Sequence, residues 1–297
     1  MQALSLRDGA LRPDDALVAV GAHDALTAAL VEESGFDIVW VSSFEVSSSR
    51  RLPDTNIVTY PEMAEIVQDI GLGCGLPVYV DADNGYGSDD CALRALCFFA
   101  GAGATAVCME DNAFPKRNSL YPENRTLEDP EIFAGRIAKL AAADTGVLLI
   151  ARTEALVAGY GVDEAVRRLE HYASAGADAL FVQVNREHSA ELPKVLARVR
   201  GKLPVVIAPT ALPDLSAGEF FSMGANVVIF ANVVTRSCIA AVARTLATLR
   251  EAGSLRGIAH EIVTLDEMFR LTKTGAWHPR LGVRRNRTAG YRPPRPK

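Results

Sequence analysis

The sequence lacks the features that mark secreted, membrane-spanning or nucleic-acid-binding proteins. Its five cysteines are odd in number and form no C-x-x-C pair, which predicts reduced thiols in a cytoplasmic protein rather than a disulfide framework. It contains no apolar run of 18 residues and no basic-then-apolar leader, so neither a membrane span nor a signal peptide is predicted. The net charge of −5 argues against a nucleic-acid partner, because such proteins are usually basic.

A glycine-rich phosphate loop is also missing after the first β-branched run, where an open doubly wound sheet would carry one. Short apolar runs instead alternate with amphipathic stretches along the chain, as in proteins with buried parallel strands. The expected strands span residues 17–20, 38–42, 78–81, 106–110, 147–152, 179–184, 205–208 and 227–231. Eight such strands predict a (β/α)8 TIM barrel over residues 1–277, including C-terminal helices, followed by a basic, proline-rich tail at 278–297.

Acidic residues follow two of the expected strands. The motif Asp-Ala-Asp-Asn-Gly-Tyr-Gly starts at Asp81, and Glu110 ends the next strand. Converging carboxylates repel one another unless a cation lies among them, and hard oxygen ligands without neighbouring Cys or His favour Mg²⁺ or Mn²⁺. Asp81, Asp83 and Glu110 are therefore the candidate metal ligands, and they predict an enzyme acting on a small anionic substrate.

Other strand ends carry groups that suit an anion. Arg152 ends the 147–152 run, where its planar guanidinium would bind a carboxylate or phosphate, although a structural ion pair with Glu154 is the alternative. Ser42 and Ser43 end the second strand and could donate hydrogen bonds to an anion. Asp54 lies in a Pro-Asp-Thr-Asn loop, where it could equally be a turn residue.

Residues 111–126 have little periodicity and predict a lid beside the acidic cluster, with a solvated loop as the alternative. Lys116 would bring positive charge over a bound anion. Asn118 and Ser119 would bring hydrogen-bond donors.

With these motifs the chain resembles the isocitrate lyase/phosphoenolpyruvate mutase superfamily, and within it the phosphoenolpyruvate phosphomutases, from about residue 17 to about residue 271. The Asp-Ala-Asp-x-Gly-Tyr-Gly motif is shared across the superfamily. The more specific part is the spacing of Glu110-Asp111 and Asn118-Ser119, with Phe-Pro-Lys between them. The resemblance implies Mg²⁺-dependent interconversion of phosphoenolpyruvate and phosphonopyruvate, a C-terminal helix exchanged between subunits, and a homodimer or homotetramer.

The resemblance also assigns roles to individual residues. Asp54 matches an aspartate that either accepts the phosphoryl group or orients it, and Arg152 matches a substrate anchor. The implied metal ligands are Asp81, Asp83 and Glu110; the catalytic residues are Asp54, Lys116, Asn118 and Arg152; the substrate-binding residues are Trp40, Ser42, Ser43, Phe44, Ser119 and Gln183.

Sequence details separate the possible reactions. No cysteine occurs between Cys108 and Cys238, which disfavours lyases that use a Lys-Lys-Cys-Gly-His or Lys-Arg-Cys-Gly-His motif. Related phosphonopyruvate hydrolases tend to carry Thr where Asn118 stands, so Asn118 favours a mutase. Asn112 and Gln183 replace a lysine and a histidine of many mutases. The alternatives are therefore a phosphonopyruvate hydrolase, a carbon–carbon lyase or hydrolase of a malate- or oxaloacetate-like diacid, and a non-catalytic anion-binding barrel.

Overall fold

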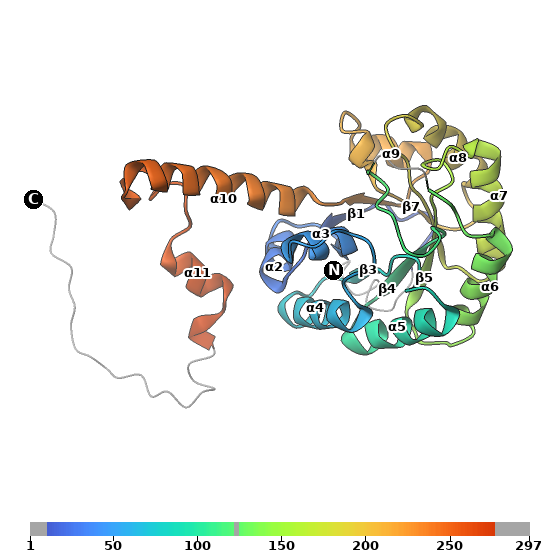
Figure 1. The fold of residues 1–297 in the computed structure, drawn as a ribbon, viewed down its shortest axis with the longest axis horizontal. Coiled ribbons are helices and arrows are strands. Elements are labelled where there is room, and N and C mark those ends of the chain that lie inside the picture. Colours follow the sequence, from blue (N-terminus) through green and yellow to red (C-terminus); the bar gives the residue numbers. More distant parts are fainter. Residues whose placement is uncertain (1–10, 122–124, 277–297) are drawn as a thin grey trace, which may run out of the picture. The chain divides into compact units, whose positions relative to one another are not determined.

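Parallel strands close into a barrel in the computed structural model, which describes residues 11–121 and 125–276 (Figure 1). Each strand pairs with the next, and the last pairs with the first, with Leu17 opposite Val227. The predicted TIM barrel is confirmed. Its strands are β1 (Leu17–Gly21), β2 (Ile38–Val41), β3 (Val78–Asp81), β4 (Ala106–Glu110), β5 (Leu148–Thr153), β6 (Ala179–Val182), β7 (Val205–Ile207) and β8 (Val227–Phe230).

The helices from α2 to α9 lie between the strands in the chain and surround the barrel, whereas α10 and α11 follow the last strand (Figure 1). Several begin at side-chain caps; Ser88, for example, accepts a hydrogen bond from the Cys91 N–H at the start of α5. The helices are α2 (Ala25–Glu33), α3 (Ser43–Ser49), α4 (Tyr60–Gly73), α5 (Asp89–Ala102), α6 (Pro130–Ala141), α7 (Gly161–Ser174), α8 (Leu192–Val199), α9 (Ala217–Met223), α10 (Val233–Ala252) and α11 (Leu265–Leu271).

Alternation along each strand decides which side chains reach the barrel interior, because successive side chains of a strand point to opposite faces. In β2, Ile38 and Trp40 belong to the interior cluster, whereas Val39 and Val41 pack in the layer under the helices. The same alternation directs the last residues of β3 and β4, Asp81 and Glu110, to the interior. The barrel mouth thus receives carboxylates directly from the strands.

Four expected strands, the second, sixth, seventh and eighth, end one or two residues earlier than predicted, and two of them, β2 and β6, carry site residues at their ends. β2 ends at Val41, because Ser42 becomes the N-cap of α3 and its hydroxyl accepts the Glu45 N–H at 3.4 Å. β6 ends at Val182, so Gln183 lies one residue beyond it. Both side chains still reach the mouth of the barrel, since they lie at the carboxyl ends of their strands.

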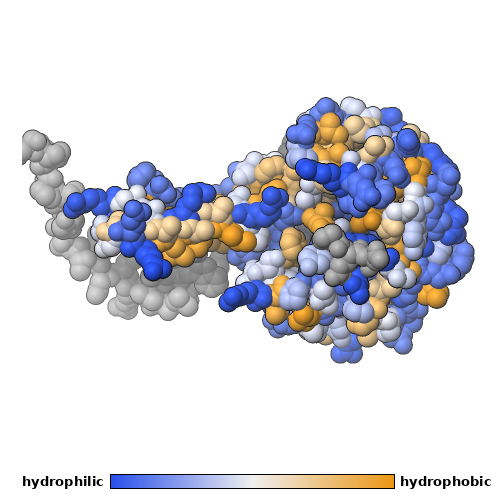
Figure 2. Space-filling model, turned by 45° about the horizontal axis from the view of Figure 1, so that its top comes forward, coloured by the Kyte–Doolittle hydropathy of each residue, from blue (hydrophilic) through white to orange (hydrophobic). Residues whose placement is uncertain are grey.

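The chain divides into two compact units, residues 1–241 and 242–297. In the second, the described part contains the end of α10, a short 3-10 turn at Leu255–Gly257, and α11. Apolar side chains gather along α10, where Ile239, Val242 and Leu246 are each more than half exposed (Figure 2). The single domain over 1–277 and the exchanged helix stay predictions, and the tail at 278–297 lies outside the described residues. Among the described helices, none has the length and apolarity needed to cross a membrane.

Candidate active site

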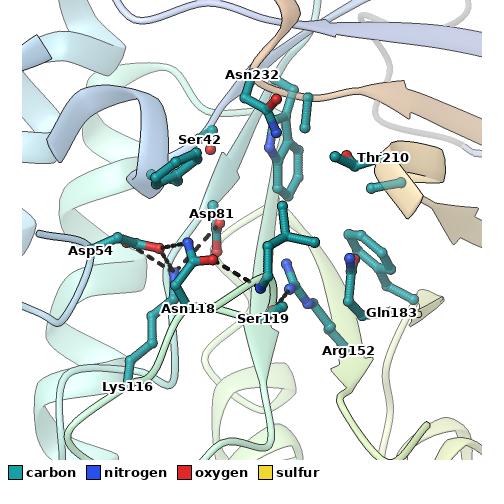
Figure 3. A pocket seen from close by; sticks show the side chains of 16 residues that line it. Ser42, Asp54, Asp81, Lys116, Asn118, Ser119, Arg152, Gln183, Thr210 and Asn232 are labelled. Carbon is teal, nitrogen blue, oxygen red and sulfur yellow. Dashed lines mark hydrogen bonds and ion pairs between the residues drawn. The ribbon is translucent and has the colours of Figure 1, made fainter. Parts of the chain in front are cut away.

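A small pocket of about 50 Å³ lies at the mouth of the barrel (Figure 3). It is lined by all but three of the predicted site residues: Trp40, Ser42, Phe44, Asp54, Asp81, Lys116, Asn118, Ser119, Arg152 and Gln183. The other three, Ser43, Asp83 and Glu110, are buried and contact the lining residues. The structure therefore brings together the whole predicted set.

Lys116 reaches from the lid into the acidic cluster. Its ammonium lies 2.5 Å from Asp83 Oδ1, 3.2 Å from Asp54 and 4.0 Å from Asp81 Oδ2, and only 3% of the side chain is exposed. Burial alone would lower the pKa of Lys116, but the surrounding carboxylates, Asp54 first, raise it well above its ordinary value. A lid lysine thus supplies positive charge to the carboxylates that were predicted to need a cation.

Asp54 is held by two lid residues. Lys116 donates to Oδ1 at 3.2 Å, and the amide of Asn118 donates to Oδ2 at 2.7 Å (Figure 3). Asp54 is 6% exposed and lines the pocket, so it is not a solvated turn residue. The contacts fix the carboxylate at the pocket edge and hold the lid over it.

Arg152 faces the pocket from the end of β5. Its Nη2 donates to Ser119 Oγ at 2.7 Å, its Nε donates to Glu154 Oε1 at 2.7 Å, and its guanidinium lies 4.8 Å from the centroid of Phe181. The ring of Trp40 packs edge-on against Phe181 at 6.2 Å. Arg152 therefore pairs with Glu154 and still lines the pocket, supported by an aromatic wall.

Glu110 is fully buried and only partly satisfied. Its Oε1 accepts from the Asn112 amide at 2.8 Å, whereas Oε2 lies 3.3 Å from Arg152 Nε and accepts no hydrogen bond within residues 11–121 and 125–276. Burial, the largest effect, raises the pKa of Glu110. A buried carboxylate oxygen that accepts no hydrogen bond, near Asp81 and Asp83, suits a hard cation.

Direct metal ligation by three side chains is not preformed. In the described ranges, no three His, Cys, Asp or Glu side chains are grouped closely enough to hold an ion. The donors nevertheless fit Mg²⁺, which keeps several waters and commonly binds through one or two carboxylates.

Sequence reasoning missed Asn56. Its amide donates to Asp83 Oδ2 at 3.1 Å, and its Oδ1 accepts the Lys116 N–H at 2.6 Å. Asn56 and Asp83 both have positive φ, +60° and +52°, a conformation that costs energy for residues other than glycine and often occurs at functional sites. Its place two residues after Asp54 was the available signal.

Thr210 and Asn232 were also missed, although both line the pocket (Figure 3). They follow β7 and β8, so the rule that barrel sites lie at the carboxyl ends of strands could have found them.

Comparisons with known proteins show the family of the chain. A family model described as phosphoenolpyruvate phosphomutase matches residues 6–250. A phosphonopyruvate hydrolase of Variovorax sp. (strain Pal2) is 35% identical over 85% of this chain and 89% of its own. The crystal structure of phosphoenolpyruvate phosphomutase from Streptomyces platensis subsp. rosaceus has a TM-score of 0.89 and 35% identity, covering 94% of this chain and 97% of that one.

A third relative was solved with ligands. The phosphonopyruvate hydrolase complex with oxalate and Mg²⁺ has a TM-score of 0.86 and 32% identity, covering 96% of this chain and 98% of that one. Mutase and hydrolase relatives are thus similar to this chain to nearly the same degree. On the family model and these full-length matches, the chain belongs to the phosphoenolpyruvate phosphomutase family of the isocitrate lyase/phosphoenolpyruvate mutase superfamily.

Proposed function

We propose that the protein is a phosphoenolpyruvate phosphomutase, which interconverts phosphoenolpyruvate and phosphonopyruvate. The observation that carries the proposal is the contact of Lys116 and Asn118 with Asp54, which closes the lid over a pocket of about 50 Å³. A phosphoryl group moving between carbon and oxygen must be kept from water, because water would divert it to phosphate. A small pocket covered by lid residues, one of them the positively charged Lys116, supports that chemistry.

Asp81, Asp83 and Glu110 would hold Mg²⁺, or Mn²⁺ in its place, with water completing the coordination. The ion would supply positive charge to the oxygens of the substrate when bound. The Oε2 of Glu110, which accepts no hydrogen bond from the described residues, and the buried carboxylates of Asp81 and Asp83 support this assignment. Ser43 orients Asp81 by donating to its Oδ2 at 3.1 Å.

The rearrangement needs positioning and charge neutralisation more than proton transfer. The P–C bond breaks with its electron pair left on the three-carbon fragment as an enolate, and the enolate oxygen then forms the new P–O bond. No water or proton is gained or lost. The transition state is loose and metaphosphate-like, so fixed positive groups stabilise it. Lys116 and Arg152 provide these groups, and Asp54, held by both lid residues, either accepts the phosphoryl group or orients it.

Substrate anchoring falls to the opposite side of the pocket. Arg152 would bind a carboxylate or phosphoryl group, with Ser42 and Phe44 offering further contacts, while Ser43 supports the site from behind through Asp81 and Lys116. Gln183 is buried and lines the pocket, and its side-chain amide donates to the Val184 carbonyl at 3.4 Å, so the second N–H of the amide could meet an acceptor oxygen of the substrate. Trp40 forms the floor.

A phosphonopyruvate hydrolase is the second candidate. The same groups would activate the same P–C bond, and the difference would be admission of water. A cavity of about 650 Å³ on the far side of Ser119 and Leu120 favours this alternative, because water could enter from it if the lid opened. Lyase chemistry with a lid cysteine is disfavoured, because the lid has none.

The deciding experiment is ³¹P NMR of the purified protein with phosphonopyruvate and MgCl₂, with an EDTA control. A mutase gives the phosphoenolpyruvate signal, and EDTA abolishes it. Inorganic phosphate as the sole product would mean a hydrolase, and an unchanged spectrum would refute both. Asn118→Ala should slow rearrangement about thirtyfold, since it removes a hydrogen bond to a charged group worth about 2 kcal/mol. Equal losses of thermal stability and activity in this variant would contradict its lid role.

A further inference from the structure

Arg125 holds the main chain of the lid from outside the pocket. Its Nη2 donates to the carbonyls of Asn118 at 2.8 Å and Tyr121 at 3.0 Å, and its Nη1 donates to the carbonyl of Arg117 at 3.3 Å. Only 4% of the side chain is exposed. One guanidinium therefore holds three carbonyls of the lid segment 117–121, in which Asn118, Ser119 and Leu120 line the pocket.

Glu154 connects this guanidinium to the substrate anchor. Its Oε2 lies 3.7 Å from Arg125 Nη1, and its Oε1 accepts from Arg152 Nε at 2.7 Å. The carboxylate is fully buried, and its own N–H donates to Asp111 Oδ1 at 2.8 Å. Glu154 thus lies between two guanidinium groups, one holding the lid and one facing the pocket.

We propose that Arg125 is a positioning residue that latches the lid closed, and that Glu154 couples this latch to anion binding at Arg152. An anion that pairs with Arg152 weakens that residue's hold on Glu154. The carboxylate is then freer to attract Arg125, which tightens the lid over the bound anion. This coupling rests on the proposed function in one respect, namely that an anionic ligand binds Arg152.

The surroundings of Arg125 show what the latch excludes. Arg125 lines the cavity of about 650 Å³, together with residues 119–121, 157–159 and 185–188. Ser119 and Leu120 line both this cavity and the small pocket, so they form the wall between the two. If the carbonyls on either side of this wall are released, water can pass from the large cavity to the phosphoryl group. Arg125 would therefore also determine how much phosphate is formed.

Hydrogen exchange of the lid amides tests the latch without requiring turnover. The amides of Ala113, Lys116, Leu120 and Tyr121 are hydrogen-bonded and report on closure. Exchange is measured by mass spectrometry with and without MgCl₂ and oxalate in wild type, Arg125→Gln, Arg125→Lys and Glu154→Gln. Arg136→Lys is the matched control, since Arg136 is similarly buried but pairs with Glu128 and Asp89 outside the lid.

We expect lid exchange at least tenfold faster in Arg125→Gln, an intermediate rate in Arg125→Lys, and less than a twofold change in Arg136→Lys. Glu154→Gln should lose at least half of the protection that oxalate adds. With phosphonopyruvate, Arg125→Gln should raise the phosphate share of the products severalfold. Lid exchange within twofold of wild type in folded Arg125→Gln, with and without oxalate, overturns the proposal.

Two safeguards keep the test decisive. If Arg125→Gln does not fold, Arg125→Lys replaces it, and an unchanged lid rate there overturns the latch. If wild type forms no phosphoenolpyruvate, the proposed function fails, but lid exchange still decides the latch. If wild type is a mutase and the lid amides of the variants exchange as slowly as those of wild type, the latch proposal alone is wrong.

Discussion

Glu110 and Asp111 are adjacent carboxylates, both fully buried, with opposite degrees of satisfaction. Asp111 accepts four hydrogen bonds, from Thr153 Oγ1 at 2.7 Å, the Glu154 N–H at 2.8 Å, the Tyr172 hydroxyl at 2.8 Å and Arg168 Nη1 at 3.1 Å. Glu110 accepts one, and its second oxygen has an ion-pair contact with Arg152 at 3.3 Å but accepts no hydrogen bond from the described residues. The strand end turns one side chain inward to the pocket and the next outward to α7.

The difference separates a structural carboxylate from a functional one. A buried charge with every lone pair occupied stabilises the fold, because its desolvation is repaid by its partners. A buried carboxylate that is not fully paired costs stability and persists where a ligand completes it. Hydrogen-bond satisfaction therefore distinguishes two residues that burial and residue type do not.

The largest effect is expected from Glu110→Gln. Losing this charge removes a proposed metal ligand and an inward partner of Arg152, so kcat/KM should fall about 10³-fold, or about 4 kcal/mol of transition-state stabilisation. The free energy of unfolding should change little, because a neutral amide is cheaper to bury than a poorly paired carboxylate. Activity is measured by the ³¹P assay and stability by urea denaturation. A strongly destabilised variant would mean that Glu110, like Asp111, mainly stabilises the fold.

Asp111→Asn should give the reverse pattern and a somewhat smaller effect. The amide cannot accept from all four donors and leaves Arg168 with a poorer partner, which should lower the free energy of unfolding by about 3 kcal/mol. Turnover per folded molecule should stay closer to wild type than in Glu110→Gln. Urea denaturation and activity at low temperature measure both quantities. Loss of activity without loss of stability would show that the number of hydrogen bonds a buried carboxylate accepts does not distinguish a structural carboxylate from a functional one.

The sequence anticipated the strand ends well, because side-chain alternation alone directs Asp81, Glu110 and Arg152 to the same interior. Strands of a buried parallel sheet also have continuous apolar sequences, so the barrel itself could be predicted. The resemblance supplied the roles of the lid residues. Local pattern and motif spacing therefore sufficed for the groups at strand ends and for the fold.

Contacts between distant loops could not be predicted in this way. Asn56 meets Lys116 across 60 positions, and Arg125 meets Glu154 after the lid has folded back on itself. Nothing in local periodicity encodes such pairs, because they depend on the closed shape of the lid. The same holds for Lys116, whose ammonium lies among the carboxylates where the sequence suggested only a metal.

Glu45 is a buried carboxylate whose hydrogen bonding is intermediate between that of Glu110 and that of Asp111. Its replacement should change activity and stability the least of the three. Its Oε1 accepts from Thr235 Oγ1 at 2.9 Å, whereas Oε2 is unpaired among the described residues. Burial, the largest effect, raises the pKa of Glu45 above 4.5. The native state therefore binds this proton more tightly than the unfolded state, and wild-type stability falls as pH rises from about 4.5 through the folded pKa.

Glu45→Gln removes this pH-dependent loss of stability, because the amide of glutamine does not titrate. The difference in free energy of unfolding, variant minus wild type, should therefore increase as pH rises above about 4.5, whatever its value at low pH. Urea denaturation of both proteins from pH 4.5 to pH 8 measures it. A difference that stays constant with pH would mean that Glu45 keeps its ordinary pKa. Its unpaired oxygen would then be met by water, and Glu45 would join Asp111 among the satisfied carboxylates.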